Sequence, residues 1–151
     1  MIIRRRGSTS CCRGIGQNPE PLSPLPDQMK ITFNGTDLSI ASVEHLSLAL
    51  DRFDKQPQFE LWISVPNGQS LAMLRNGSHA WLMYLRFNGD SGVVTKGNQD
   101  HQGTCAYTLS NGEVDEHPLS WCIDLEECYK AIAYFFVNDG ARYDHVAWQI
   151  A

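Results

Sequence analysis

Two stretches of this sequence repeat apolar residues at spacings of three and four, the pattern of an amphipathic helix. The first covers residues 43–53, begins after Ser42, a residue type that caps helices, and stops before Pro57. Its apolar stripe consists of Val43, Leu46, Ala49 or Leu50, and Phe53. A helix with one apolar side needs a sheet or another helix to cover it.

The second helical stretch covers residues 124–136 and has better-defined ends. Asp124 and Glu127 stand three residues apart at its start, where each side chain can cap a backbone N–H of the first turn. Gly140 follows the last turn and can adopt the positive φ of a C-terminal cap. The apolar stripe consists of Leu125, Cys128, Ile132, Phe135 and Phe136. A cap contributes about 1 kcal/mol, less than burial of these side chains, so packing on a sheet decides whether the helix forms.

The rest of the chain from residue 29 onwards alternates apolar and polar residues with the period of a half-buried strand. Strands are predicted at residues 30–33, 59–64, 71–75, 80–87, 93–96, 104–109 and 146–148. Asn-Gly pairs at residues 34–35, 76–77 and 111–112 mark tight turns between them. Residues 80–87 are apolar on both faces, which indicates a central strand. The pattern predicts an α+β fold, an antiparallel meander sheet of about five to seven strands flanked by two helices.

Residues 1–28 show neither period. They contain four Arg and four of the seven Pro of the chain, and we expect them to be disordered. One explanation is that Met29 is the true start and that residues 1–28 are a mis-assigned N-terminal extension. The predicted domain is therefore 29–151.

Charge separates these two parts. Residues 1–28 carry a net charge of +2, whereas residues 29–151 hold eight Lys and Arg against fifteen Asp and Glu, a net charge of −7. An acidic domain repels nucleic acid and favours basic partners, although the charge taken alone is best explained by solubility. No apolar run approaches the ~20 residues of a membrane helix, so no membrane is expected as a partner.

The cysteines and histidines indicate no metal, cofactor or disulfide framework. Five cysteines are an odd number without framework spacing, and we interpret Cys105, Cys122 and Cys128 as small buried hydrophobes in a reducing cytoplasm. The five histidines are isolated from one another in the sequence. One catalytic alternative is a Cys105 nucleophile with His101 or His117 as its base.

Polar side chains concentrate in two predicted loops, residues 88–103 and 111–117. The carboxylates expected to contact a partner in one shared surface are Asp90, Asp100, Glu113, Asp115 and Glu116, with Tyr107 or Trp62 as an aromatic anchor. Acidic groups of this kind bind Lys and Arg through charge-assisted hydrogen bonds. The alternative is two solvated turns without a binding role.

The order of several motifs resembles that of another protein family. Lys96-Gly97-Asn98, the acidic residues 113–118, the helix and the C-terminal ending to Trp148 resemble family-one immunity proteins of bacterial polymorphic toxin systems. The family's helix pattern, its Arg-containing turn and its terminal Trp correspond here to Ala131, Phe135, Phe136, Arg142 and Trp148. The family often has Pro after the Arg, where this chain has Tyr143. The resemblance covers residues 29–151.

The resemblance implies a cytoplasmic antidote that binds a cognate toxin domain, such as a nucleic-acid deaminase or nuclease, with no cofactor and no catalysis. Acidic loops would then enter the basic substrate groove of the toxin and occlude its active site. Two alternatives are kept, a small-molecule-binding or regulatory domain without catalytic activity and an enzyme that uses Cys105.

Overall fold

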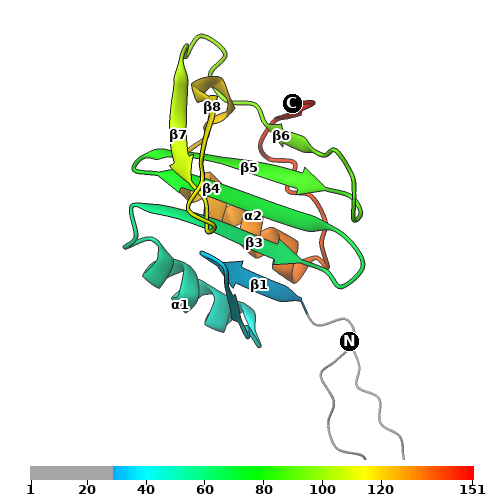
Figure 1. Cartoon of the computed structure of the whole chain (residues 1–151). Coiled ribbons are helices and arrows are strands. Elements are labelled where there is room, and N and C mark those ends of the chain that lie inside the picture. Colours follow the sequence, from blue (N-terminus) through cyan, green and yellow to red (C-terminus); the bar gives the residue numbers. More distant parts are fainter. Residues whose placement is uncertain (1–28) are drawn as a thin grey trace, which may run out of the picture.

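The computed structural model describes residues 29–151, so the expectation for residues 1–28 lies outside the described part (Figure 1). The main sheet contains, in spatial order, β2 (Thr36–Leu38), β1 (Lys30–Phe33), β3 (Gln58–Ser64), β4 (Ser70–Asn76), β5 (His79–Leu85), β6 (Val93–Thr95) and β9 (Trp148–Gln149). A small second sheet pairs β7 (Thr104–Thr108) with β8 (Val114–Pro118). The helices are α1 (Val43–Phe53) and α2 (Leu125–Val137), and a short 3-10 helix, η1 (Leu119–Trp121), precedes α2. All strand pairs are antiparallel, so the predicted α+β meander with two helices is confirmed.

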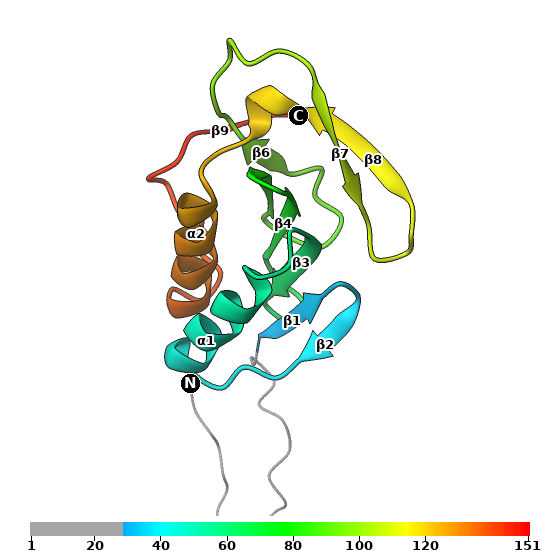
Figure 2. The same cartoon turned by 90° about the vertical axis from the view of Figure 1, so that its left-hand side faces the viewer.

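Both helices pack on one face of the main sheet, and the β7–β8 hairpin lies on the other face (Figures 1 and 2). The helices bury Leu46, Ala49, Leu50 and Phe53 of α1 and Cys128, Ala131, Ile132 and Phe135 of α2. Beneath them, β3 buries Phe59, Leu61 and Ile63, the apolar half of its predicted alternation. Neither helix of the described chain is long and apolar enough to cross a lipid bilayer.

The two helix starts differ in how they are capped. The hydroxyl oxygen of Ser42 accepts a hydrogen bond from the N–H of His45 at 3.1 Å, as its position predicts. The Asp124 side chain makes no capping bond, so the predicted capping box is wrong. The carboxylate of Glu127 instead lies 3.4 Å from Lys130 Nζ and accepts from the Tyr143 hydroxyl at 3.5 Å. The Glu127 side chain that the capping box requires is thus engaged by Lys130 in the next turn and by Tyr143 beyond the helix.

The predicted acidic loop at residues 113–118 is largely a strand, β8. A hydrogen bond from the N–H of Leu109 to the carbonyl of Glu113 closes the hairpin at 2.8 Å. Val114, Asp115 and Glu116 are all exposed, so no apolar alternation marked this strand in the sequence. Pairing with β7, whose Tyr107 is buried, creates the strand instead.

Side chains of the main sheet hold the outer edge of β7. Gln58 Oε1 accepts from the N–H of Thr108 at 3.1 Å, and Asn76 Nδ2 donates to the carbonyl of Ala106 at 2.7 Å. These two bonds satisfy backbone groups that would otherwise lie unpaired along a strand edge. The hairpin is therefore attached to the sheet by hydrogen bonds as well as by apolar packing.

Gly97 brings the segment after β6 close to the end of η1. Its N–H donates to the carbonyl of Ser120 at 2.7 Å, and a Cβ on Gly97 would overlap the carbonyl oxygen of Cys122. Only glycine permits so close an approach of two backbones. The loop before β7 and the segment after β8 are thus fixed against each other.

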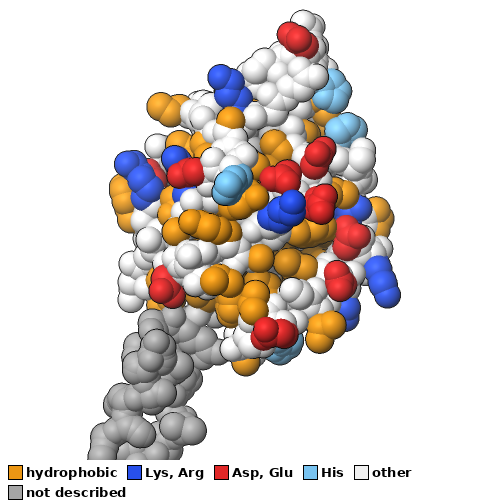
Figure 3. All heavy atoms as spheres, turned by 180° about the vertical axis from the view of Figure 1, so that it is seen from behind, with side chains coloured by type: hydrophobic (Ala, Val, Ile, Leu, Met, Phe, Trp, Pro, Cys, Tyr) orange, Lys and Arg blue, Asp and Glu red, His pale blue; other side chains and the backbone are white. Residues whose placement is uncertain are grey.

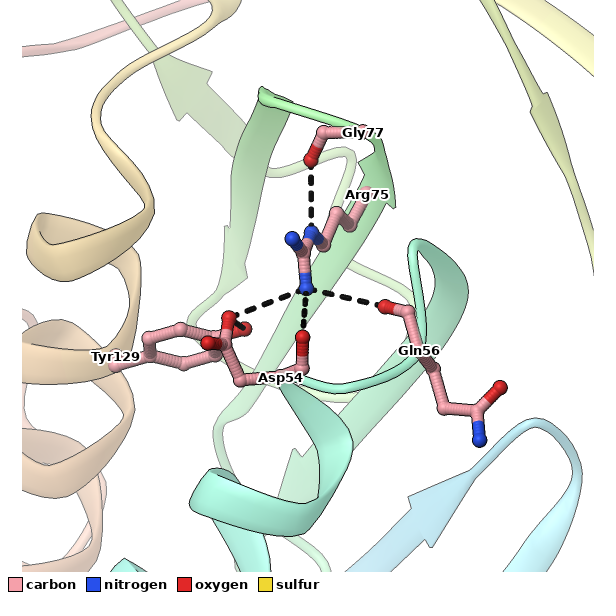
Figure 4. A network of polar contacts seen from close by, with 5 residues as sticks. All are labelled: Asp54, Gln56, Arg75, Gly77 and Tyr129. Carbon is pink, nitrogen blue, oxygen red and sulfur yellow. Dashed lines mark hydrogen bonds and ion pairs between the residues drawn. The ribbon is translucent and has the colours of Figure 1, made fainter.

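Arg75 joins three segments on the helix side of the sheet (Figure 4). Its Nη1 donates to the carbonyl oxygens of Asp54 and Gln56 at 2.8 and 3.0 Å, and its Nε donates to that of Gly77 at 2.8 Å. The same Nη1 lies 3.1 Å from the Asp54 carboxylate, which also accepts from the hydroxyl of Tyr129 on α2 at 2.8 Å. The end of α1, the β4–β5 turn and α2 are connected through one guanidinium.

Candidate partner interface

The predicted polar loop 88–103 is divided by β6, and its first part, which contains Asp90, lies at the end of the main sheet opposite the hairpin. β5 begins at His79, which pairs with Asn76, and ends at Leu85, which pairs with Ser70. The loop that contains Asp90 follows the Leu85 end, whereas the hairpin is bonded to Asn76 at the other end. Seven residues of strand separate the two ends by roughly 20 Å. The expectation of one shared blocking surface is therefore wrong, and only the hairpin and the loop before it remain together.

Asp90 is part of the structure of its own loop. Its Oδ2 accepts from the backbone N–H and from Nε of Arg86, both at 2.9 Å, and its Oδ1 accepts from Nη2 at 3.0 Å. The Asp90 side chain is only 4% exposed, whereas that of Arg86 is 72% exposed. The hydrogen bonds from Arg86 hold the pKa of Asp90 well below its usual range. The outward-facing group of this pair is the guanidinium, so this loop does not present a free carboxylate at Asp90.

The two expected aromatic anchors occupy different environments. Tyr107 is 1% exposed and packs with Leu74, Trp81 and Val94, so it belongs to the core beneath the hairpin and not to the surface. Burial raises the pKa of Tyr107, whose hydroxyl lies 3.4 Å from Cys122 Sγ. Trp62 is half-buried on the sheet face opposite the helices, and its Nε1 donates to a carboxylate oxygen of Glu60 at 2.8 Å. Only Trp62 remains accessible to a partner.

Glu60 of β3 positions the hairpin turn, a role that the sequence did not indicate. Its Oε1 accepts from the N–H of Ser110 at 2.9 Å, which fixes the hairpin turn over β3. Burial alone would raise the pKa of Glu60, but hydrogen bonds from Ser110 and Trp62 outweigh it and lower the pKa. No local pattern indicates this role, because Glu60 and Ser110 are fifty residues apart in sequence.

The remaining expected contacts are exposed around the hairpin. Asp115 pairs with Tyr107 and Glu116 with Ala106, so the two carboxylates lie on opposite faces of β8. Glu113 lies at the turn and Asp100 in the loop before β7, and both are exposed. Among the described residues, none of these four carboxylates lies within ion-pair distance of a Lys or Arg.

The charge around the hairpin is negative without local compensation. Hairpin residues 104–118 contain Glu113, Asp115 and Glu116 and no Lys or Arg, and the loop before them adds Asp100. The helix side of the molecule is different, since Figure 3 shows Lys and Arg side chains interspersed there with Asp and Glu. The hairpin thus presents carboxylates with no Lys or Arg interspersed among them.

An aromatic stack holds β8 against the main sheet. The His117 ring centroid lies 4.7 Å from that of Trp81 and 5.3 Å from that of Trp121, with which it is nearly parallel. Burial lowers the pKa of His117, and Asp115, whose Oδ2 is 3.8 Å from Nε2, raises it to a smaller extent. His117 is thus neutral at pH 7 and packs as an aromatic ring, which its isolated position in the sequence did not indicate.

The sequence allowed two alternatives, an enzyme that uses Cys105 and a small-molecule-binding domain, and the structure shows the surroundings of each candidate site. Cys105 lies directly opposite His117 in the β7–β8 ladder, but its thiol faces the carbonyl oxygen of Ala106 at 3.7 Å. A partly open hollow beside the β3–β4 turn is lined by residues 64–68, Lys30, Ser70 and Asn88, and none of them is aromatic, in contrast to the side chains that line most small-molecule sites. No three His, Cys, Asp or Glu side chains within residues 29–151 are grouped so as to hold a metal ion.

No model of a known protein family matches the chain, and no curated protein matches it significantly. The exposed carboxylates of the hairpin are therefore the feature that bears most directly on function.

Proposed function

We propose that this protein binds and neutralises a basic toxin domain that acts on nucleic acid, as an immunity protein does. The observation that carries the proposal is the exposed acidic hairpin, whose residues 104–118 include Glu113, Asp115 and Glu116 and no Lys or Arg. Proteins that act on nucleic acid present basic grooves to the phosphate backbone. A rigid acidic hairpin that enters such a groove excludes the substrate.

The carboxylates of Glu113, Asp115 and Glu116 are the groups proposed to contact the toxin, with Asp100 at the rim. Because these carboxylates are exposed and form no ion pair with a Lys or Arg of residues 29–151, they are available to Lys and Arg of the partner. Charge complementarity of this kind also accelerates encounter between the two proteins. Rapid capture is useful when both proteins are made in the same cytoplasm.

The resemblance to family-one immunity proteins supports the proposal through the fold more than through the site. Phe135 and Ala131 are core residues of α2, whereas Phe136 and Trp148 are half-buried against the same core. The Arg142 guanidinium lies 5.7 Å over the ring of Trp148. These positions determine how the chain packs, and the acidic residues of the hairpin determine what it binds.

The proposed partner is a cognate toxin domain, either a deaminase or a nuclease, and not nucleic acid itself. The negative charge of the hairpin side disfavours direct contact with phosphates. The proposed role requires no cofactor and no catalytic step by this chain, and it places the protein in the cytoplasm with its toxin.

Co-purification tests the proposal. The chain would be produced together with a tagged, inactive form of the toxin domain encoded immediately upstream, and association would be measured at micromolar concentration. We expect a stable complex and loss of toxin activity on its nucleic-acid substrate when the wild-type domain is used. If the two proteins do not associate at that concentration, the proposed function is wrong.

A further inference from the structure

β8 has a free edge, and it is the longest free edge of the described structure. The main sheet ends in β2 with three residues and β9 with two, whereas β8 has five. Short edge strands offer little backbone for pairing with another chain. The edge of β8 is therefore the part of this fold best suited to accept an additional strand.

The hydrogen bonds of the hairpin identify which backbone groups point outward. The N–H of Leu109 donates to the carbonyl of Glu113, and the N–H of Leu119 donates to that of Gly103, so every second residue pair between these two is hydrogen-bonded. The N–H and C=O groups of Asp115 and His117 are accordingly used by β7. Those of Val114 and Glu116 point away from β7.

The corresponding edge of β7 is already occupied. The carbonyl of Ala106 and the N–H of Thr108 are bonded to Asn76 and Gln58 of the main sheet. A new strand can therefore join the hairpin only along β8. Pro118, which has no N–H, ends this edge.

We propose that the edge of β8 pairs with an extended segment of the toxin domain, which carries Lys or Arg beside Glu116 and Asp115. This inference rests on the proposed function and specifies how the hairpin engages its partner. Main-chain hydrogen bonds at Val114 and Glu116 provide the register, and the carboxylates select a basic strand. The Val114 side chain, 60% exposed, adds an apolar contact beside the new strand.

Charge argues against a second copy of this chain as the occupant. Two β8 edges paired with each other would bring Asp115 and Glu116 of one copy beside those of the other. Like charges directly opposite one another destabilise a strand pair. The same carboxylates thus prevent self-association and favour a basic segment.

Amide hydrogen exchange, resolved by residue in NMR spectra, tests this inference on the wild-type protein. In the free protein the outward amides of Val114 and Glu116 exchange fast, and those of Asp115 and His117 exchange slowly. In the complex with the inactive upstream toxin domain, we expect the Val114 and Glu116 amides to slow by at least about tenfold. The Asp115 and His117 amides, already bonded to β7, provide the internal control.

A pair of variants separates the backbone from the side chain. Val114→Pro removes one outward donor on an edge position where proline is tolerated, and Val114→Ala removes only the side chain. We expect Val114→Pro to weaken the complex about tenfold and Val114→Ala by less than about threefold. Thermal unfolding of the free variants checks that the hairpin still forms.

The outcomes distinguish the two proposals. If a complex forms but the outward amides are not protected, the edge pairing is wrong and the proposed function stands. If a complex forms and Val114→Pro binds as well as Val114→Ala, the edge pairing is likewise wrong. If no complex forms at micromolar concentration, the proposed function is wrong. The pairing at the edge of β8 is then wrong as well, because it rests on that function.

Discussion

Single residues that bond across elements constrain this fold more than any local pattern does. Arg75 is the clearest case, because its side chain is 11% exposed and donates to carbonyl oxygens of two separate turns. A guanidinium presents several donors in a fixed plane, which suits several carbonyls at once. Local sequence shows only a basic residue near the end of a strand.

Arg75→Met keeps the length of the side chain and removes every donor. We expect it to lower the free energy of unfolding by about 2–4 kcal/mol, because several carbonyls and the Asp54 carboxylate lose their partner. Arg75→Lys, which keeps one charged donor group, should cost roughly half as much. Urea denaturation measures both, and a loss below about 0.5 kcal/mol in Arg75→Met would contradict the assigned role.

Gly140 allows a second residue-scale test. Its φ is +91°, a Cβ there would lie 2.7 Å from Val65 Cγ2, and its carbonyl accepts from the Tyr84 hydroxyl at 2.7 Å. Gly89 has the same φ of +91° with nothing within 4 Å of an added Cβ, so it is a matched control. We expect Gly89→Ala to cost about 1 kcal/mol from backbone strain and Gly140→Ala about 2 kcal/mol or more. Equal losses in denaturant unfolding would show that the contact with Val65 has no effect.

At the scale of elements, the β7–β8 hairpin shows how a strand forms without an apolar pattern. β8 has only His117 and Pro118 partly buried, and the pairing partner β7 provides the buried Tyr107. The hairpin therefore depends on the stack around His117 and on bonds from Gln58, Asn76 and Glu60. Its stability should respond to the protonation of that one ring.

Acid should weaken the packing of the hairpin. The pKa of His117 is lower in the folded protein than its unfolded value of about 6.5, so the unfolded state binds the proton more readily. The stabilising contribution is complete above pH 6.5 and is lost as the pH falls from there toward the folded pKa. His117→Phe keeps an aromatic ring and should remove this part of the pH dependence. Denaturant unfolding between pH 7.5 and 5 measures it, and an unchanged slope in His117→Phe would exclude His117 as the source.

At the scale of the whole molecule, the position of the negative charge matters more than its total. The acidic residues of the hairpin lie on the side opposite the helices, whereas the helix side carries both signs. The loop with Asp90 lies at the far end of β5 and presents Arg86 outward. The proposed partner is thus attracted to one side and one end of the protein.

Reversal of charge at the hairpin should slow association with the toxin domain. We expect Asp115→Lys with Glu116→Lys to lower the association rate by about tenfold or more at low salt, with the melting temperature nearly unchanged. Glu44→Lys with Asp51→Lys makes the same change in net charge on exposed positions of α1 and is the matched control. Stopped-flow association at several salt concentrations measures both, and equal slowing by the two variants would show that net charge alone steers the partner.

Sequence patterns predicted the elements whose burial follows a period and missed those made by long-range contacts. Helices α1 and α2 and strands β3, β4 and β5 were predicted within a few residues, since one face of each is apolar. The strand β8 was missed because its first three residues are exposed and show no apolar alternation, and the burial of Tyr107 was missed because it packs against Leu74 and Trp81 of other strands. Of the expected contacts, Asp100, Glu113, Asp115 and Glu116 are exposed on the hairpin side, whereas Asp90 is engaged by Arg86.

By itself, the sequence determined the α+β class, the two packed helices and the acidic character of residues 97–129, because periodicity and charge are properties of short segments. Only the tertiary structure decided which carboxylates face solvent, which are paired internally and which strand keeps a free edge. Several of those properties depend on groups fifty or more residues apart, such as Glu60 with Ser110 and Asp54 with Tyr129, and contacts between such distant residues leave no trace in a local pattern.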